Sequence, residues 1–196
     1  LMNLKILSVL LLAFCFPVVK AYGADDMRIT TIEEADKAYL SGQYDKAASY
    51  YQALLANLEG RAKTKSPALV AAVRFRLGQA QLGEGKLEQG LNNMKDFYEN
   101  NPENPFVVRS YALALFQNKK YRESIPVFEK AAVLDKSFAA RTYFYTGTAK
   151  YLSGETSGAI NDLTRARDMD PQSREGKNAG ALLADLEKNI RETSGM

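Results

Sequence analysis

The sequence predicts an all-α protein made of repeated pairs of antiparallel helices, and three observations support this fold class. Residues 140–171 carry apolar side chains at helical spacing on both sides of a turn at residues 152–155. The same layout recurs three times upstream, at 28–59, 71–102 and 105–136. The four turns, at Gly42, Gly85, Lys119 and Gly154, are 43, 34 and 35 residues apart. A helix pair cannot bury its apolar faces alone, so the repeats are expected to stack.

In the last repeat, small residues predict where the two helices approach each other. Gly147 lies on the first helix and Ala159 on the second, and both face the expected contact. Asp170 and Pro171 end the second helix, because proline disfavours helical backbone in the residue before it. We therefore expect Gly147 and Ala159 to face each other across the pair.

The landmarks of the repeats resemble those of the tetratricopeptide repeat. The period is close to 34 residues, and the second helices keep small and aromatic residues in order, as in Gly90, Met94, Phe97 and Pro102. The family's tryptophan is absent from every copy, and its tyrosine is replaced by Ala38, Gln81, Leu115 and Lys150. The resemblance implies a right-handed superhelix of helix pairs, with the first helix of each repeat lining a concave groove.

One more amphipathic helix is expected after the last repeat. Residues 173–190 place Ala179, Leu183 and Leu186 on one face, with no second helix to pair with. A solitary final helix covers the open apolar end of a repeat array. We therefore expect residues 24–190 to form one repeat domain with a C-terminal capping helix, followed by a flexible tail at 191–196.

Residues 1–23 have the pattern of a secretory signal peptide. Lys5 is followed by an apolar run from Ile6 to Val19, and small residues stand at Ala21 and Gly23. The run is shorter than the 20 or so residues of a membrane-spanning helix. Lipidation at Cys15 is the alternative, but the bulky Phe14 precedes it. We expect cleavage before Ala24 and a periplasmic or secreted protein.

Removal of that segment would leave a nearly neutral protein without cysteine. The net charge of the whole chain is +3, and loss of Lys5 and Lys20 lowers it to +1. A charge near zero and an exported location disfavour nucleic acid as a partner. With the single cysteine removed, disulfides are excluded and the core alone must hold the fold.

The residue types argue against an enzyme. There is no histidine, so Ser-His and Cys-His catalysis and the usual zinc sites are excluded, and no cofactor or metal is expected. Residues 83–87 are not a phosphate loop, because Leu87 replaces the required Ser or Thr. Glu84 and Glu155 are candidates for a glycan-cleaving carboxylate pair, with polar turn residues as the plainer interpretation.

A basic segment lengthens the first spacing. It contains Arg61, Lys63 and Lys65 and ends at Ser66 and Pro67, which predict a helix cap and first position. A solvated loop is the plainer interpretation of these charges, and a basic docking spot is the alternative.

Nine residues are candidates for a partner-binding surface. The resemblance places the first-helix residues in the groove, and these helices carry more apolar residues than one buried face requires. The alternative for the aromatic ones is packing between neighbouring repeats. The candidates are Tyr39, Phe75, Leu82, Phe106, Arg109, Phe116, Arg141, Phe144 and Tyr151.

Arg109 and Arg141 occupy neighbouring first-helix places and are expected to reach one ligand together. As exposed arginines, they could be reversed in charge without loss of the fold. The family's Asn positions for clamping a C-terminal carboxylate hold Asp36 and Gln79 instead, which argues against that form of recognition.

The sequence thus predicts an exported scaffold that binds a protein or peptide partner of the cell envelope in a concave groove, in assembly or secretion. The alternative from another class is a small-ligand or glycan-binding protein with weak hydrolase activity. Self-association through the same groove is a third interpretation.

Overall fold

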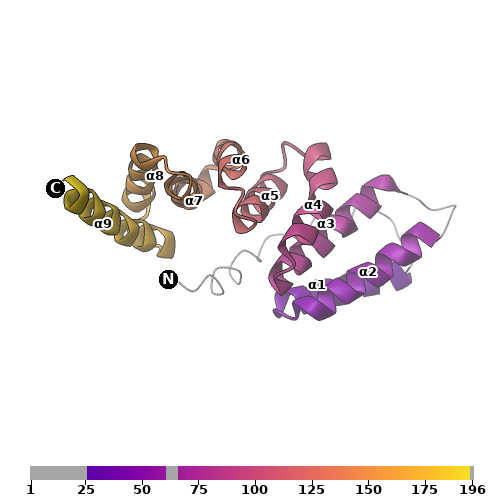
Figure 1. Cartoon of the computed structure of the whole chain (residues 1–196). Coiled ribbons are helices and arrows are strands. Elements are labelled where there is room, and N and C mark those ends of the chain that lie inside the picture. The colour runs from indigo at the N-terminus through magenta and orange to yellow at the C-terminus, as the bar shows by residue number, and fades with distance from the viewer. Residues whose placement is uncertain (1–25, 61–65, 195–196) are drawn as a thin grey trace. The chain divides into compact units, whose positions relative to one another are not determined.

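The computed structural model describes residues 26–60 and 66–194, and every regular element within them is a helix (Figure 1). The helices are α1 (Asp26–Leu40), α2 (Tyr44–Gly60), α3 (Pro67–Glu84), α4 (Leu87–Asn100), α5 (Pro105–Gln117), α6 (Tyr121–Leu134), the short 3₁₀ helix η2 (Lys136–Phe138), α7 (Ala139–Leu152), α8 (Thr156–Met169) and α9 (Arg174–Ser194). This order confirms the all-α prediction. The expected signal peptide and the basic residues Arg61, Lys63 and Lys65 lie outside the described residues.

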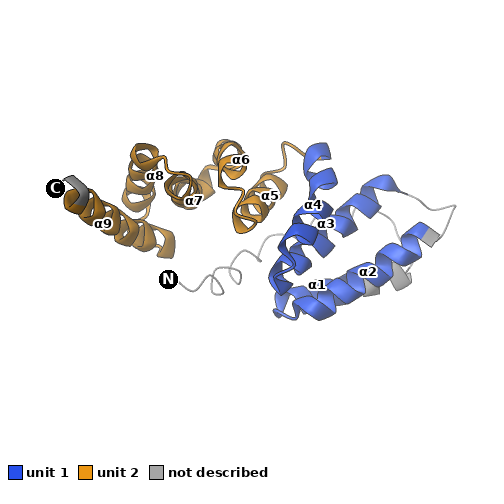
Figure 2. Ribbon diagram, in the orientation of Figure 1, with its two compact units in different colours: residues 1–100 blue, residues 101–196 orange. Residues whose placement is uncertain are grey.

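The helices form two compact units, which Figure 2 colours separately. In the first unit, α1 packs on α2, α2 on α3, and α3 on α4. In the second, α5 to α9 pack in the same consecutive way. The division falls between Asn100 and Asn101, in the turn that separates the second and third repeats.

The four predicted turns share one backbone feature. Gly42, Gly85 and Gly154 have φ angles of 77°, 85° and 86°, and Lys119 has a φ angle of 61°. Left-handed backbone ends a helix and turns the chain, and glycine adopts it with the least steric cost. The spacing of the repeats is therefore confirmed at its turns, and Lys119 occupies the place of a glycine.

Two helix starts follow from local chemistry. Ser66 precedes Pro67 and accepts a hydrogen bond from the Leu69 backbone N–H, as the sequence predicts. Asn104 does the same before Pro105, accepting from the Phe106 and Val107 N–H groups. Proline suits the first helical position because its missing N–H would have no partner there.

Small residues bring the paired helices close together, as predicted for the last repeat. A Cβ atom on Gly147 would lie 2.8 Å from Leu163 Cγ and 3.2 Å from the Ala159 carbonyl oxygen. The second repeat shows the same feature, since a Cβ on Gly78 would lie 2.5 Å from the Gly90 carbonyl oxygen. In both pairs, a larger side chain would push the backbones apart.

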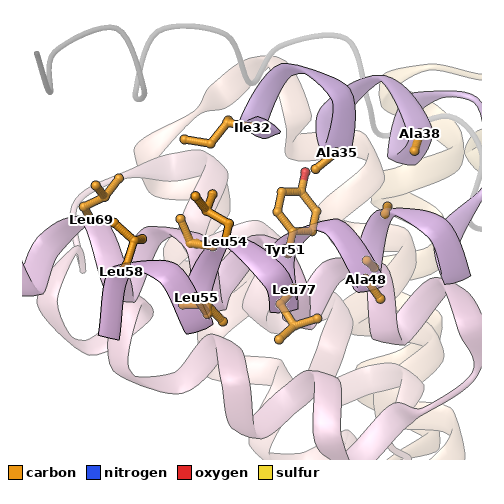
Figure 3. Close-up of a cluster of buried hydrophobic side chains, with 13 residues drawn as sticks. Ile32, Ala35, Ala38, Ala48, Tyr51, Leu54, Leu55, Leu58, Leu69 and Leu77 are labelled. Atoms are coloured by element: carbon orange, nitrogen blue, oxygen red, sulfur yellow. The ribbon is translucent and has the colours of Figure 1, made fainter. Parts of the chain in front are cut away.

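The core of the first unit gathers aliphatic side chains of α1, α2 and α3 around Tyr51 (Figure 3). The Tyr51 hydroxyl donates to Asp36 of α1, which also pairs with Arg76 of α3. Burial first, and the Asp36 carboxylate second, raise the pKa of Tyr51 well above its usual value. This contact joins all three helices through polar groups.

In the second unit, α9 packs on α8 and continues to Ser194, beyond residue 190, where the sequence predicts the end of the helix and the start of a flexible tail. Ala179, Leu183 and Leu186 are buried on the face that α9 turns inward. Deeper in the unit, the rings of Phe128 and Tyr145 stack with their centres 5.3 Å apart. Among the described helices, none combines the length and apolar character needed to cross a membrane.

Candidate protein-binding site

Three of the nine candidate residues lie in the core. Phe75, Phe116 and Phe144 are 3%, 8% and 4% exposed. Phe75 packs on Phe97 with ring centres 5.2 Å apart, and both Phe116 and Phe144 contact the ring of Tyr145. These three side chains therefore pack between helices, and they offer little surface to a partner.

The half-buried candidates keep part of their side chains accessible. In the first unit, Tyr39 meets Tyr44 edge to face, and Leu82 lies against Gly90. In the second unit, Phe106, Arg141 and Tyr151 are half-buried. Both charged candidates, Arg109 and Arg141, belong to the second unit.

Arg109 is buried, although the sequence predicts an exposed arginine. Only 6% of its surface is accessible, and its guanidinium carbon lies 3.7 Å from the centre of the Phe138 ring. The ring of Phe106 is 5.7 Å away. A cation over an aromatic face is favourable, more so when water is excluded. The expectation that Arg109 could be reversed in charge without loss of the fold is therefore wrong, because a glutamate there would bury a carboxylate between two rings.

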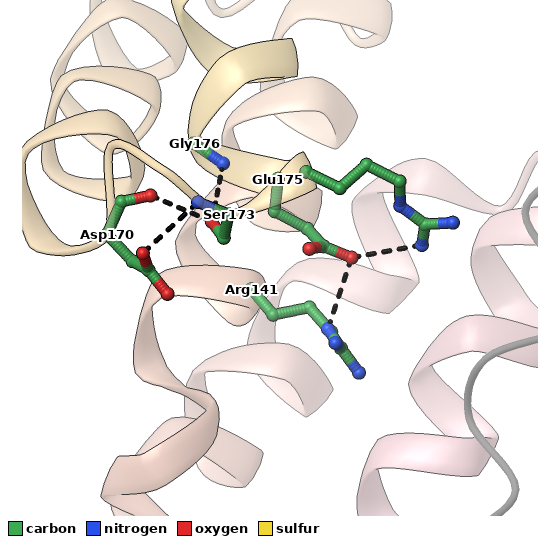
Figure 4. Close-up of polar contacts among 6 residues, drawn as sticks. Arg141, Asp170, Ser173, Glu175 and Gly176 are labelled. Carbon is green, nitrogen blue, oxygen red and sulfur yellow. Dashed lines mark hydrogen bonds and ion pairs between the residues drawn. The ribbon is translucent and has the colours of Figure 1, made fainter.

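Arg141 approaches the same phenylalanine and also pairs with the capping helix. Its guanidinium carbon lies 5.6 Å from the Phe138 ring centre. Its Nε atom is 3.2 Å from Oε1 of Glu175, near the start of α9 (Figure 4). Arg174 binds the same oxygen at 3.0 Å. Arg141 thus has one of its nitrogens paired with Glu175, and the same glutamate oxygen also pairs with Arg174.

These contacts define an arginine cluster, made of Arg109, Phe138, Arg141, Arg174 and Glu175. Its members come from α5, η2, α7 and α9, and all belong to the second unit. Arg141 and Arg174 are the accessible arginines of the cluster, and they share the single Glu175 carboxylate. Guanidinium groups recognise carboxylates by charge-assisted hydrogen bonds. The cluster is therefore suited to an acidic ligand.

Local structure fixes the cluster at two points. Asp135 caps η2 by accepting from the Ser137 N–H at 3.0 Å, which places Phe138 at the end of that short helix. Ser173 caps α9, since its hydroxyl accepts from the Gly176 N–H at 3.0 Å and donates to the Asp170 carbonyl (Figure 4). These caps fix the backbone that carries Phe138 and Glu175, the two residues that Arg141 contacts.

The negative member of the cluster is the least accessible. The Glu175 side chain is 8% exposed, against 29% for Arg141 and 36% for Arg174. Burial chiefly, with the Glu175 charge second, raises the pKa of the neighbouring Tyr145 to about 12. The carboxylate lies on the inner side of the two guanidinium groups, which keep their more accessible surfaces toward solvent.

The sequence predicted only part of this cluster. The sequence predicts that Arg109 and Arg141 reach one ligand together, and in the structure both lie near the ring of Phe138. Phe138, Arg174 and Glu175 were not candidates. A signal for Glu175 exists in its place just after Ser173, because acidic side chains are favoured in the first turn of a helix.

The candidate carboxylates for glycan cleavage have turn roles. Glu84 pairs with Lys86 across the α3–α4 turn at 2.6 Å, and Glu155 is exposed before α8. Within residues 26–60 and 66–194, no group of three acidic, histidine or cysteine side chains is placed to hold a metal ion.

Comparison with known families decides the relationship. A tetratricopeptide repeat model matches residues 75–139 and again 112–174, which together span more than half of the chain. A second tetratricopeptide repeat model matches residues 37–60. The chain belongs to the tetratricopeptide repeat family. No curated protein sequence matches it.

Solved structures share the fold of this tetratricopeptide repeat protein at low sequence identity. MamA 41-end from Desulfovibrio magneticus RS-1 is 16% identical, with a TM-score of 0.65 over 87% of this chain and 98% of that one. MamA MSR-1 is 18% identical, with a TM-score of 0.64 over 84% and 91%. The first tetratricopeptide repeat domain of Spaghetti (RPAP3), bound to the HSP90 peptide SRMEEVD, is 22% identical, with a TM-score of 0.53 over 61% and 92%.

Proposed function

We propose that this protein is an interaction scaffold that binds an acidic peptide segment of a partner at the arginine cluster. The proposal rests on two shared contacts. Arg109 and Arg141 lie near the same ring, that of Phe138, and Arg141 and Arg174 pair with the same carboxylate, that of Glu175. The guanidinium groups of Arg141 and Arg174 select carboxylates, and the half-buried rings of Phe106 and Phe138 offer apolar contact beside them.

Membership of the repeat family supports the scaffold role. Among the structural neighbours, the Spaghetti (RPAP3) domain is described in complex with a short peptide, SRMEEVD, which carries three acidic residues. The peptide SRMEEVD is a ligand of the Spaghetti (RPAP3) domain. For the present chain, it supports a peptide as the kind of ligand that this fold accommodates, and the arginine cluster supplies the charge preference.

We also propose that the protein acts in the cell envelope after export. The support is the signal-peptide pattern of residues 1–23, with small residues at Ala21 and Gly23. Intact-mass measurement of the protein from an envelope fraction tests it. A mature chain starting at Ala24 is expected, and a mass that includes residues 1–23, or a lipidated Cys15, would contradict it.

Peptide selection tests the binding role without a known partner. Peptides selected from a random display library on the purified mature protein are expected to be rich in Asp and Glu. Arg141→Gln should weaken their binding roughly tenfold, by loss of a charge-assisted contact. Arg122→Gln is the matched control, since Arg122 is exposed on α6 in the same unit. Selected peptides without acidic residues, or equal loss in both variants, would contradict the proposal.

A further inference from the structure

We infer that Glu175 is an internal competitor for the arginine cluster, so that an acidic ligand binds by displacing this carboxylate from Arg141 and Arg174. The inference rests on the proposed function and concerns how the same site is regulated. It assigns a second role to the capping helix α9, whose Glu175 would occupy the site when no ligand is bound.

The first support is the geometry of the contact. One oxygen, Oε1 of Glu175, lies 3.2 Å from Arg141 Nε and 3.0 Å from Arg174 Nη2. The two guanidinium groups therefore converge on a single carboxylate oxygen, as they would on the carboxylate of a bound side chain. A partner's Asp or Glu that sought the same two groups would meet a like charge already in place.

The second support is the place of Glu175 in the chain. It lies in the first turn of α9, next to the cap formed by Ser173 and Gly176 (Figure 4). The apolar attachment of α9 comes later, through Ala179, Leu183 and Leu186. The Glu175 contacts and the close packing of Gly176 on Asp170 hold the first turn. Displacing Glu175 would therefore loosen that turn while the later apolar contacts keep the rest of α9 packed on α8.

The third support is electrostatic. Arg109 stacks on Phe138, the ring that Arg141 also approaches. With Glu175 in place, the charges of Arg141 and Arg174 exceed that of the glutamate by one, and without it by two. The Glu175 carboxylate thus weakens the attraction of the site for acidic ligands without cancelling its positive charge. A competitor of this kind raises the ligand concentration that binding requires.

Binding of a defined probe tests the inference. The probe is a fluorescein-labelled hexaglutamate peptide, and hexaglutamine is its neutral control, measured by fluorescence anisotropy on the whole mature protein at low and moderate salt. Glu175→Gln keeps the shape and removes the charge, so it should bind hexaglutamate roughly tenfold more tightly than the wild type. Glu187→Gln, at an exposed position of the same helix, is the matched control and should change affinity little.

A second variant separates charge from loosening of α9. Glu175→Asp keeps the negative charge on a shorter side chain, so its affinity should stay near that of the wild type. Equal tightening by Glu175→Asp and Glu175→Gln would overturn the inference, because a looser helix would then be the cause. Tightening by Glu187→Gln as large as that by Glu175→Gln would also overturn it, as a general charge effect.

Hydrogen exchange on the wild type gives a test that needs no variant. If hexaglutamate displaces Glu175, backbone amides in the first turns of α9 should exchange faster when the peptide is bound. Unchanged or slower exchange there would overturn the inference. If the wild type binds and Arg141→Gln weakens binding while Glu175→Gln has no effect, the competitor role of Glu175 is rejected and the proposed function stands. If neither the wild type nor any variant binds hexaglutamate, both the competitor role and the binding of acidic ligands are rejected.

Discussion

At the residue scale, the close approach at Gly147 makes a sharp prediction about stability. Its added Cβ would meet Leu163 Cγ at 2.8 Å and the Leu163 backbone nitrogen at 3.0 Å. Because backbone cannot yield as a side chain does, Gly147→Leu should destabilise the protein by about 1–3 kcal/mol. Urea unfolding followed by circular dichroism measures the change.

Gly180 supplies the control for that experiment. It lies in α9, and an added Cβ there would meet only the Arg167 side chain at 3.8 Å, an ordinary contact. Gly180→Ala should therefore stabilise the protein by up to about 1 kcal/mol, because alanine favours helix over glycine. A Gly147→Leu variant as stable as the wild type would show that α7 and α8 do not meet at this glycine.

The backbone of the four turns predicts opposite changes in stability when glycine is introduced at one turn and removed from another. Lys119 adopts the left-handed backbone that Gly42, Gly85 and Gly154 adopt in the other turns. Lys119→Gly should stabilise the protein by up to about 1 kcal/mol, because the steric cost of the side chain is removed. Gly85→Lys, with open space around its Cβ position, should destabilise it by a similar amount. Thermal and urea unfolding check both signs, and a destabilised Lys119→Gly would contradict the explanation.

Tyr145 predicts a loss of stability at alkaline pH. Its pKa is raised from 10.0 to about 12, chiefly by burial, so the folded state holds this proton more tightly than the unfolded state. The stabilisation is complete below pH 10 and is lost as the pH rises toward 12, by at most about 3 kcal/mol. Between pH 9 and 11, Tyr145→Phe should lose about 1–1.5 kcal/mol less stability than the wild type, because pH 11 is still below the folded-state pKa. Urea unfolding at both pH values measures it, and equal losses would contradict the assignment.

At the element scale, the capping helix is predicted to be held by its apolar face. Leu183→Ala should cost about 2–5 kcal/mol, because the side chain is buried against the rest of the second unit. Ile190→Ala, on the same helix and 39% exposed, should cost much less. Urea unfolding compares the two, and similar losses would mean that α9 is not anchored through Leu183.

The elements themselves were largely predictable, because their signals are local. Turn glycines, the Ser66 cap before Pro67 and the face of α9 each depend on residues within a few positions of one another. Burial of particular aromatics was not. Phe116 and Phe106 lie on the same helix and both look like surface candidates in the sequence, but Phe116 meets Phe128 and Tyr145 from two other helices. Only the packed structure supplies those neighbours.

The site shows the same division. The nearness of Arg109 and Arg141 could be predicted from the repeat register, since the two residues occupy places about one helical turn apart in neighbouring first helices. Phe138 belongs to a short 3₁₀ turn, and Glu175 to the capping helix, so neither occupies an equivalent place in every repeat. A repeat pattern predicts what recurs, and the residues that complete this cluster do not recur.

At the scale of the whole molecule, the second unit contains every residue of the arginine cluster and the cap that Glu175 belongs to. The stability of repeat proteins is close to a sum of repeat and nearest-neighbour contributions, so two helix pairs with their cap can fold alone. The fragment 101–196 should therefore melt cooperatively and bind hexaglutamate with the affinity of the whole protein. The fragment 26–100, with the same number of helix pairs and no arginine cluster, is the matched control and should not bind. Circular dichroism and anisotropy test both, and a folded fragment 101–196 that binds clearly more weakly would place part of the ligand contact in residues 26–100.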